Sequence, residues 1–254
     1  MRLVQSGPVL GLLAQPLLLG VLGATVGLGE VGWSAGLVCA AVTNSVLALG
    51  LARNRPDVLR PADWVTLTRA TLVCAVAALT ADSFVRPVSV PMLVGVTTAA
   101  LVLDGVDGWV ARRTRTASSL GARFDMEVDA FLILVLSVYV AGSAGAWVLA
   151  IGSARYALGV AGWLRPWLRR ASPRRPWAKV VAATQGVVLT VAAAGVLPGR
   201  MAGALLVVAL LLLAESFGRQ VWWLWSQRER EPEPVVAIGP DRAVGEDAAA
   251  RMSA

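Results

Sequence analysis

The sequence predicts an all-α protein that crosses a membrane about eight times. Hydrophobic residues make up 57% of its 254 residues, and the mean hydropathy is +0.67. Apolar runs recur along the chain, each close to the roughly 20 residues that a helix needs to cross a bilayer. Basic residues gather in every second connection between these runs. This pattern excludes a soluble enzyme, and it explains the net charge of +7 by membrane topology rather than by nucleic-acid binding.

Eight apolar runs are long enough to be spans, and an even number places both termini on the same side. The predicted spans are 8–28, 33–52, 64–81, 88–109, 125–142, 145–164, 180–197 and 201–224. The first follows a single early Arg2 and has a long apolar body without a clear stop. It is therefore expected to be a retained helix rather than a cleaved signal peptide.

The distribution of basic residues predicts the orientation. With a cytoplasmic amino terminus, the cytoplasmic segments and their adjoining helix ends contain 20 of the 23 Lys and Arg residues. The opposite loops contain only Arg86 and Arg200, and Arg155 falls inside a span. The positive-inside rule therefore predicts a protein integral to the cytoplasmic membrane, with the acidic stretch 104–129 at the cytoplasmic face.

The two ends of the chain are expected to lie outside the functional core. Residues 1–55 are predicted to form two additional transmembrane helices, which could be a packing element or an oligomer contact. Cys39 and Cys74 both lie in apolar runs, so no disulfide is predicted. Proline, charged and small residues dominate 227–254, which predicts a disordered cytoplasmic tail.

Four aspartates are concentrated in one stretch between two apolar runs. One helical face would carry Asp104, Asp107, Gly108 and Ala111, and a face of the next helix would carry Gly121, Asp125 and Asp129. Two helices joined by the polar residues 112–120 can turn these carboxylates toward one another. So many negative charges beside apolar surface require cations. With no His in the chain and no Cys nearby, the ligands are oxygens, which favour Mg²⁺, Mn²⁺ or Ca²⁺.

The same stretch resembles the signature of the CDP-alcohol phosphatidyltransferases, Asp-x2-Asp-Gly-x2-Ala-Arg-x8-Gly-x3-Asp-x3-Asp. All eight positions match with their spacing intact: Asp104, Asp107, Gly108, Ala111, Arg112, Gly121, Asp125 and Asp129. The resemblance implies a six-helix catalytic core over 56–226. It implies transfer of a phosphatidyl group from CDP-diacylglycerol to an alcohol with release of CMP. Two divalent ions, Mg²⁺ or Mn²⁺, and a homodimer are implied as well.

The resemblance also implies a role for each matching residue. The implied metal ligands are Asp104, Asp107, Asp125 and Asp129, assisted by the backbone carbonyl of Gly105, and Asp129 is also the implied general base. A second, weaker motif, Asn-x2-Thr-x2-Arg, is matched by Thr66 and Arg69, with Asp63 in place of the Asn as an expected helix cap. The implied nucleotide-binding residues are Thr66, Arg69, Asp107, Gly108, Ala111, Arg112, Gly121 and Asp125.

Basic residues on later helices point to the acceptor. An arginine inside a span, as at Arg155, is costly unless it faces a polar cavity or an acid. In branches of the family that use a phosphorylated acceptor, such residues hold its phosphate. Arg155 and Lys179 are therefore the expected acceptor-binding residues. They favour a phosphorylated polyol, such as glycerol 3-phosphate or inositol phosphate, over serine or phosphatidylglycerol.

Two other functions compete with this interpretation. A membrane cation or solute transporter would also explain intramembrane acids, but not the spacing of the Gly and Ala residues or Arg112. Such a transporter would also be expected to show interrupted helices deep in the membrane. An inactive structural homologue is disfavoured because all four aspartates are present.

Overall fold

A computed structural model of the chain describes residues 6–54, 61–114, 119–169 and 176–228. Within these ranges the chain forms eight α-helices, two short 3-10 helices and no strand, so the predicted all-α class is confirmed. The α-helices are α1 (Ser6–Val26), α2 (Glu30–Asn54), α3 (Pro61–Asp82), α4 (Val90–Thr114), α5 (Ser119–Ala144), α6 (Leu149–Leu164), α7 (Pro176–Ala193) and α8 (Gly199–Arg228); the 3-10 helices are η1 (Ala146–Val148) and η2 (Pro166–Arg169).

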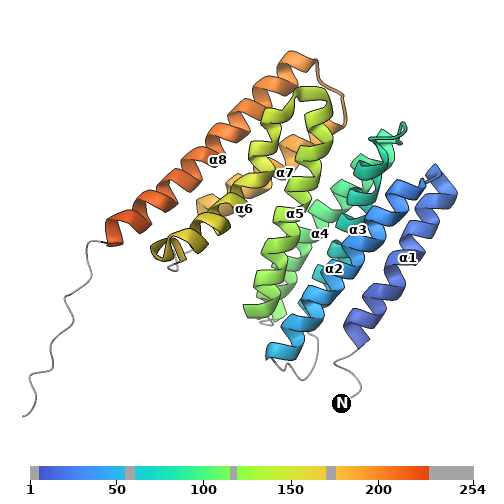
Figure 1. The fold of residues 1–254 in the computed structure, drawn as a ribbon, viewed down its shortest axis with the longest axis horizontal. Coiled ribbons are helices and arrows are strands. Elements are labelled where there is room, and N and C mark those ends of the chain that lie inside the picture. Colours follow the sequence, from blue (N-terminus) through green and yellow to red (C-terminus); the bar gives the residue numbers. More distant parts are fainter. Residues whose placement is uncertain (1–5, 55–60, 115–118, 170–175, 229–254) are drawn as a thin grey trace, which may run out of the picture.

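Consecutive helices run in alternating directions. Figure 1 shows the turns that join α1 to α2, α3 to α4, α5 to α6 and α7 to α8 at one end of the bundle. The start of α3, the end of α4 and the start of α5 therefore lie together at the opposite end. This alternation brings both halves of the aspartate signature, and the weaker motif on α3, to the same end of the molecule.

Helix α3 is the centre of the amino-terminal half of the bundle. It contacts α1, α2, α4 and α5. Within its apolar window 72% of the residues are buried, compared with 17–28% in the other three long apolar helices. Its buried stretch includes Ala75, Val76 and Ala78, none of which is exposed. Such small side chains let neighbouring helices approach closely, so a residue on α3 faces several helices at once.

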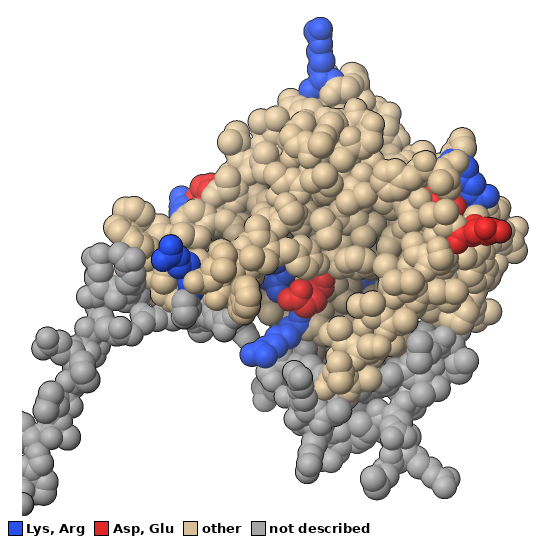
Figure 2. Space-filling model, in the orientation of Figure 1, with Lys and Arg blue, Asp and Glu red and all other residues tan. Residues whose placement is uncertain are grey.

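The outer helices present apolar residues outward. In the described part of the chain, four helices are long and apolar enough to cross a membrane: Glu30–Leu49, Val65–Asp82, Ala146–Leu164 and Gly199–Ser226. Shorter apolar helices lie at Ala14–Val26, Val90–Val106 and Trp177–Ala193. Charged side chains are sparse on the face seen in Figure 2. An apolar exterior of this kind is suited to lipid, and the chain is an integral membrane protein.

Some helices extend beyond the predicted spans. Helix α4 continues to Thr114 and α5 already begins at Ser119, so most of the expected polar connection is helical. Pro176 begins α7, the position where proline suits a helix best. Lys179 therefore lies in the first turn of this helix, directly before the predicted span 180–197.

The amino-terminal pair, α1 and α2, packs against α3 through a buried carboxylate. Asp82 is 1% exposed and accepts hydrogen bonds from the backbone N–H groups of Gly29 (3.0 Å) and Gly32 (3.3 Å). The Arg86 Nε donates to the same carboxylate at 2.6 Å. A Cβ at Gly29 would lie 2.7 Å from an Asp82 oxygen and 2.9 Å from Arg86 Nε, so a larger residue there would displace this ion pair. Of the two roles left open by the sequence, the described contacts support a packing element.

Replacing Asp82 with asparagine is expected to destabilise the protein by about 2–4 kcal/mol, because charge-assisted hydrogen bonds to two backbone amides and an ion pair are weakened together. Thermal unfolding in detergent measures the effect. Glu30→Gln is the matched control, since Glu30 is an exposed acid in the first turn of α2. Equal stability of the two variants would contradict a structural role for the Asp82 carboxylate.

Candidate active site

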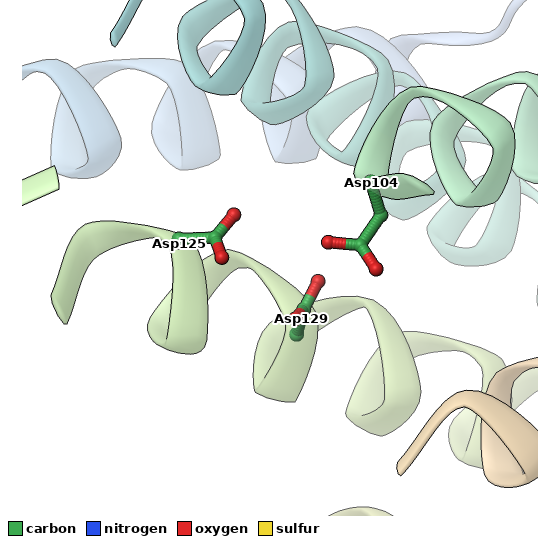
Figure 3. Close-up of side chains that lie close together, drawn as sticks. All are labelled: Asp104, Asp125 and Asp129. Atoms are coloured by element: carbon green, nitrogen blue, oxygen red, sulfur yellow. The ribbon is translucent and has the colours of Figure 1, made fainter. Parts of the chain in front are cut away.

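Three aspartates from two helices converge on one point. Figure 3 shows Asp125 and Asp129 on successive turns of α5, facing Asp104 on α4. One carboxylate oxygen from each residue lies within 4.8 Å of the other two. Their side chains are 33–42% exposed, so the cluster is reachable from outside the bundle. The i, i+4 spacing on α5 produces this convergence, because it places both carboxylates on the side of the helix that faces α4.

The guanidinium of Arg69 lies among these three carboxylates. Its Nη1 is ion-paired with Asp104, and its Nη2 contacts Asp125 Oδ1 at 2.5 Å and Asp129 Oδ1 at 3.2 Å. The same Nη2 also donates to the backbone carbonyl of Asp125 at 3.1 Å. Arg69 is 1% exposed, so its charge is neutralised by the aspartates and not by water. Three carboxylates therefore share the single guanidinium of Arg69.

The cluster lies inside the helices rather than at their ends. Arg69 is the eighth residue after the start of α3, and Asp125 is the sixth after the start of α5. At a rise of 1.5 Å per residue, each lies about 9–12 Å along the helix axis from that end. Asp104 and Asp129 lie ten residues from the same ends, or about 15 Å. The apolar runs predicted shorter helices here, with Asp104 five residues before the end of span 88–109 and Asp125 at the start of span 125–142. The difference arises because α4 and α5 continue past the apolar runs.

The remaining predicted site residues are distributed around the cluster. Thr66 is 3% exposed and lies one turn before Arg69 on α3. Gly121 lies one turn before Asp125 on α5, as its spacing predicts. Gly105 is exposed on α4, and a Cβ there would meet no atom within 4 Å. The described side chains do not include Asp63, Asp107, Gly108, Ala111 and Arg112, so the roles expected for them stay predictions.

Arg155 on α6 has the acidic partner that an arginine in a span requires. Its Nη2 donates to Glu127 Oε1 on α5 at 2.6 Å. Helices α5 and α6 approach closely here, since a Cβ at Gly152 would lie 2.6 Å from the Cα of Leu134. Glu127 was not singled out from the sequence. The sequence did offer one signal, because Glu127 is a third acid between Asp125 and Asp129. Two residues rotate by about 200° around a helix axis, so Glu127 is expected on a different face of α5 from Asp125.

Both residues expected to bind the acceptor lie on helices packed against those that carry the aspartates. Helix α6, with Arg155, contacts α5, and helix α7, with Lys179, contacts both α4 and α5. Arg155 is held by Glu127, which lies between Asp125 and Asp129 in the sequence. Lys179 is exposed in the first turn of α7.

The donor set suits a hard divalent cation. Carboxylate oxygens are the preferred ligands of Mg²⁺ and Mn²⁺, and three carboxylates here share one guanidinium. Three oxygens from two rigid helices would need only small side-chain movements to reach a common ion. The cluster of Asp104, Asp125 and Asp129 is thus compatible with metal binding.

A comparison with protein-family models is consistent with this geometry. The model described as CDP-alcohol phosphatidyltransferase matches residues 59–224, which is more than half of the chain. The match includes the aspartate cluster and Arg69, and it leaves α1 and α2 outside. Comparison with curated proteins and with solved structures gave no significant match.

Proposed function

Since the chain belongs to the CDP-alcohol phosphatidyltransferase family, we propose that it transfers the phosphatidyl group of CDP-diacylglycerol to a phosphorylated polyol and releases CMP. Membership of the family makes the chain a membrane transferase of phospholipid biosynthesis that acts on a CDP-alcohol and an acceptor. Enzymes of this family generally use divalent metal ions. The donor lipid, the acceptor and the roles of individual residues are the proposed part.

The convergence of Asp104, Asp125 and Asp129 carries the proposal. Residues separated by up to 25 positions in the sequence present three oxygens within 4.8 Å of one another. A pyrophosphate carries several negative charges that must be neutralised before a hydroxyl can attack it. Two Mg²⁺ or Mn²⁺ ions, held by these aspartates and Asp107, would supply that neutralisation when bound.

The reaction requires one proton acceptor and one leaving group. The oxygen of the acceptor hydroxyl forms a bond to the phosphorus that carries diacylglycerol. The bond between this phosphorus and the bridging oxygen breaks, and its electron pair leaves with CMP. Asp129 is proposed to take the hydroxyl proton, because it belongs to the cluster and is the general base that the family signature implies.

The remaining predicted residues would orient the substrates. Thr66, Gly108, Ala111, Arg112 and Gly121 are proposed to contact the nucleotide, with the glycines and alanine leaving space against the helix backbones. Arg155 and Lys179 are proposed to hold the phosphate of the acceptor.

In this proposal the acceptor phosphate competes with Glu127 for Arg155. An anion that enters between Arg155 and Lys179 would offer Arg155 a second partner in place of the Glu127 carboxylate. Because Glu127 and Arg155 are 54% and 41% exposed, this exchange does not require burial of an unpaired charge.

The location follows the charge pattern of the chain. We propose that the site faces the cytoplasm at the cell membrane, because the helix ends near it belong to the basic side. A homodimer remains a prediction from the family resemblance.

The test is CMP release by the purified protein in lipid, with CDP-diacylglycerol, Mg²⁺ or Mn²⁺, and a panel of acceptors. The panel contains glycerol 3-phosphate, inositol phosphate, serine and phosphatidylglycerol. A phosphorylated acceptor is expected to support release. Lys179→Gln is expected to raise the KM for that acceptor by about tenfold, since one charge-assisted contact is lost, with little change in the KM for the donor.

Arg200→Gln serves as the matched control, because Arg200 is an exposed cation at the opposite end of the bundle. It should leave both KM values unchanged. Release that depends on serine or phosphatidylglycerol instead would overturn the assignment of the acceptor. Absence of release with every acceptor, from folded protein, would overturn the proposed reaction.

A further inference from the structure

Arg69 makes contacts that the proposed reaction does not explain. A residue expected to bind phosphate would direct its guanidinium toward the substrate. Here both terminal nitrogens are engaged by carboxylates: Nη1 by Asp104, and Nη2 by Asp125 and Asp129. The oxygens it occupies belong to the same three residues that could hold a metal ion. Arg69 and a divalent cation therefore compete for the same ligands.

Burial restricts what Arg69 can do. The side chain is 1% exposed, and its Nε has no hydrogen-bond partner among the described groups. A buried guanidinium is tolerated only with compensating negative charge, and three carboxylates provide it. The carboxylates in turn need the guanidinium, because three carboxylates this close repel one another unless a cation lies between them. The cluster and Arg69 thus stabilise each other as a unit.

Displacing the guanidinium from the aspartates requires a new anionic partner for it. The diphosphate of a CDP-alcohol supplies one, since arginine binds phosphate through two parallel hydrogen bonds. Metal ions bound to the aspartates would at the same time remove the attraction that holds Arg69 in place. Ion binding and diphosphate binding are then favourable together and less favourable separately, which is a coupling between two ligands.

We propose that Arg69 is the internal counter-ion of the aspartate cluster, which lowers its affinity for divalent ions until a nucleoside diphosphate arrives to bind the guanidinium. The inference rests on the proposed function, because it takes the cluster to be the metal site. It assigns Arg69 a regulatory contact with the metal ligands in addition to its expected contact with the nucleotide. Ions and CDP-alcohol would consequently bind cooperatively.

Binding of Mn²⁺ to protein in lipid nanodiscs, followed by electron paramagnetic resonance, tests this directly. CDP is the probe for the diphosphate. In the wild type, saturating CDP is expected to tighten Mn²⁺ binding by about tenfold. Arg69→Gln is expected to bind Mn²⁺ about tenfold more tightly than the wild type without CDP, because the competing charge is gone. The added effect of CDP should then be lost.

The matched control is Arg86→Gln. Arg86 is also an arginine paired with a buried aspartate, but its partner is Asp82 and it lies in the connection from α3 to α4, at the other end of the bundle. The variant should lose stability and keep the wild-type affinity for Mn²⁺, with and without CDP. It separates competition at the cluster from a general effect of destabilisation.

Arg69→Lys covers the case in which the glutamine variant does not fold. Lysine keeps the charge but cannot bridge three carboxylates, so Mn²⁺ affinity should rise by less than in the glutamine variant. Thermal unfolding gives a second readout, since Mn²⁺ should raise the Tm of the Arg69 variants by more than that of the wild type.

Two results would overturn the inference, and they are distinguishable. Unchanged or weaker Mn²⁺ binding in both Arg69 variants would show that Arg69 does not compete with the ion, and would leave the proposed function intact. Absence of Mn²⁺ binding in the wild type with CDP present would overturn the metal site, and with it the proposed reaction.

Discussion

Replacing Asp129 with asparagine is expected to lower the rate of CMP release at saturating substrates by about 10³-fold, because general-base catalysis typically contributes 10²–10⁴-fold. Asparagine has the same shape and keeps one oxygen toward the cluster, but it cannot accept a proton. The KM for the donor should change little, since Asp104 and Asp125 still present their carboxylates. Steady-state release of CMP with varied donor separates the two parameters.

Glu215→Gln is the control for the loss of an acid. Glu215 lies on α8, where it accepts a hydrogen bond from Trp177 and pairs with Arg219, and it has no part in the cluster. This variant should keep the wild-type rate. If the Asp129 variant also kept that rate, another group would have to accept the hydroxyl proton, and the assignment of Asp129 would be wrong.

Removing divalent ions is expected to reduce CMP release to the background level. The cluster contains three carboxylates and the donor's diphosphate adds further negative charge, so donor and cluster would repel each other without added cations. Titration with a chelator, followed by return of Mg²⁺ or Mn²⁺, measures the effect. Activity should return with either ion.

Asp104→Asn tests whether the aspartate cluster is the site of this metal dependence. With one of three carboxylates neutralised, the Mg²⁺ concentration for half-maximal activity should rise by at least about tenfold, because a charged ligand has been replaced by a weaker neutral one. The Glu215→Gln control should not shift the titration. Full activity of the wild type in excess chelator would contradict a metal-dependent reaction.

Much of the site could be predicted from the sequence, because it depends on local spacing. Asp125 and Asp129 are one helical turn apart, so any helix through them places both carboxylates on one face. The apolar runs have the length that a bilayer requires, and this was sufficient to predict the helices. Their ends were less predictable, since arginines and serines at 110–124 are compatible with either a connection or a helix end.

The partners of the buried charges were not predictable in the same way. Arg69 was expected to contact phosphate, yet it pairs with Asp104 and Asp125, which are 35 and 56 residues away in the sequence. Similarly, the partner of Arg155 is Glu127, 28 residues earlier, which no motif singles out. Such pairings depend on which faces of two helices are in contact. The hydropathy of each helix does not predict those faces.

Length, apolar content and spacing are properties of single helices, so the sequence by itself determined the all-α membrane class and the two aspartate faces. The neighbours of α3 were decided only by tertiary packing. A buried charge must find its counter-charge wherever the fold brings one within a few ångströms, because neither water nor lipid can neutralise it there. That requirement places Arg69 among three aspartates and Asp82 against α2.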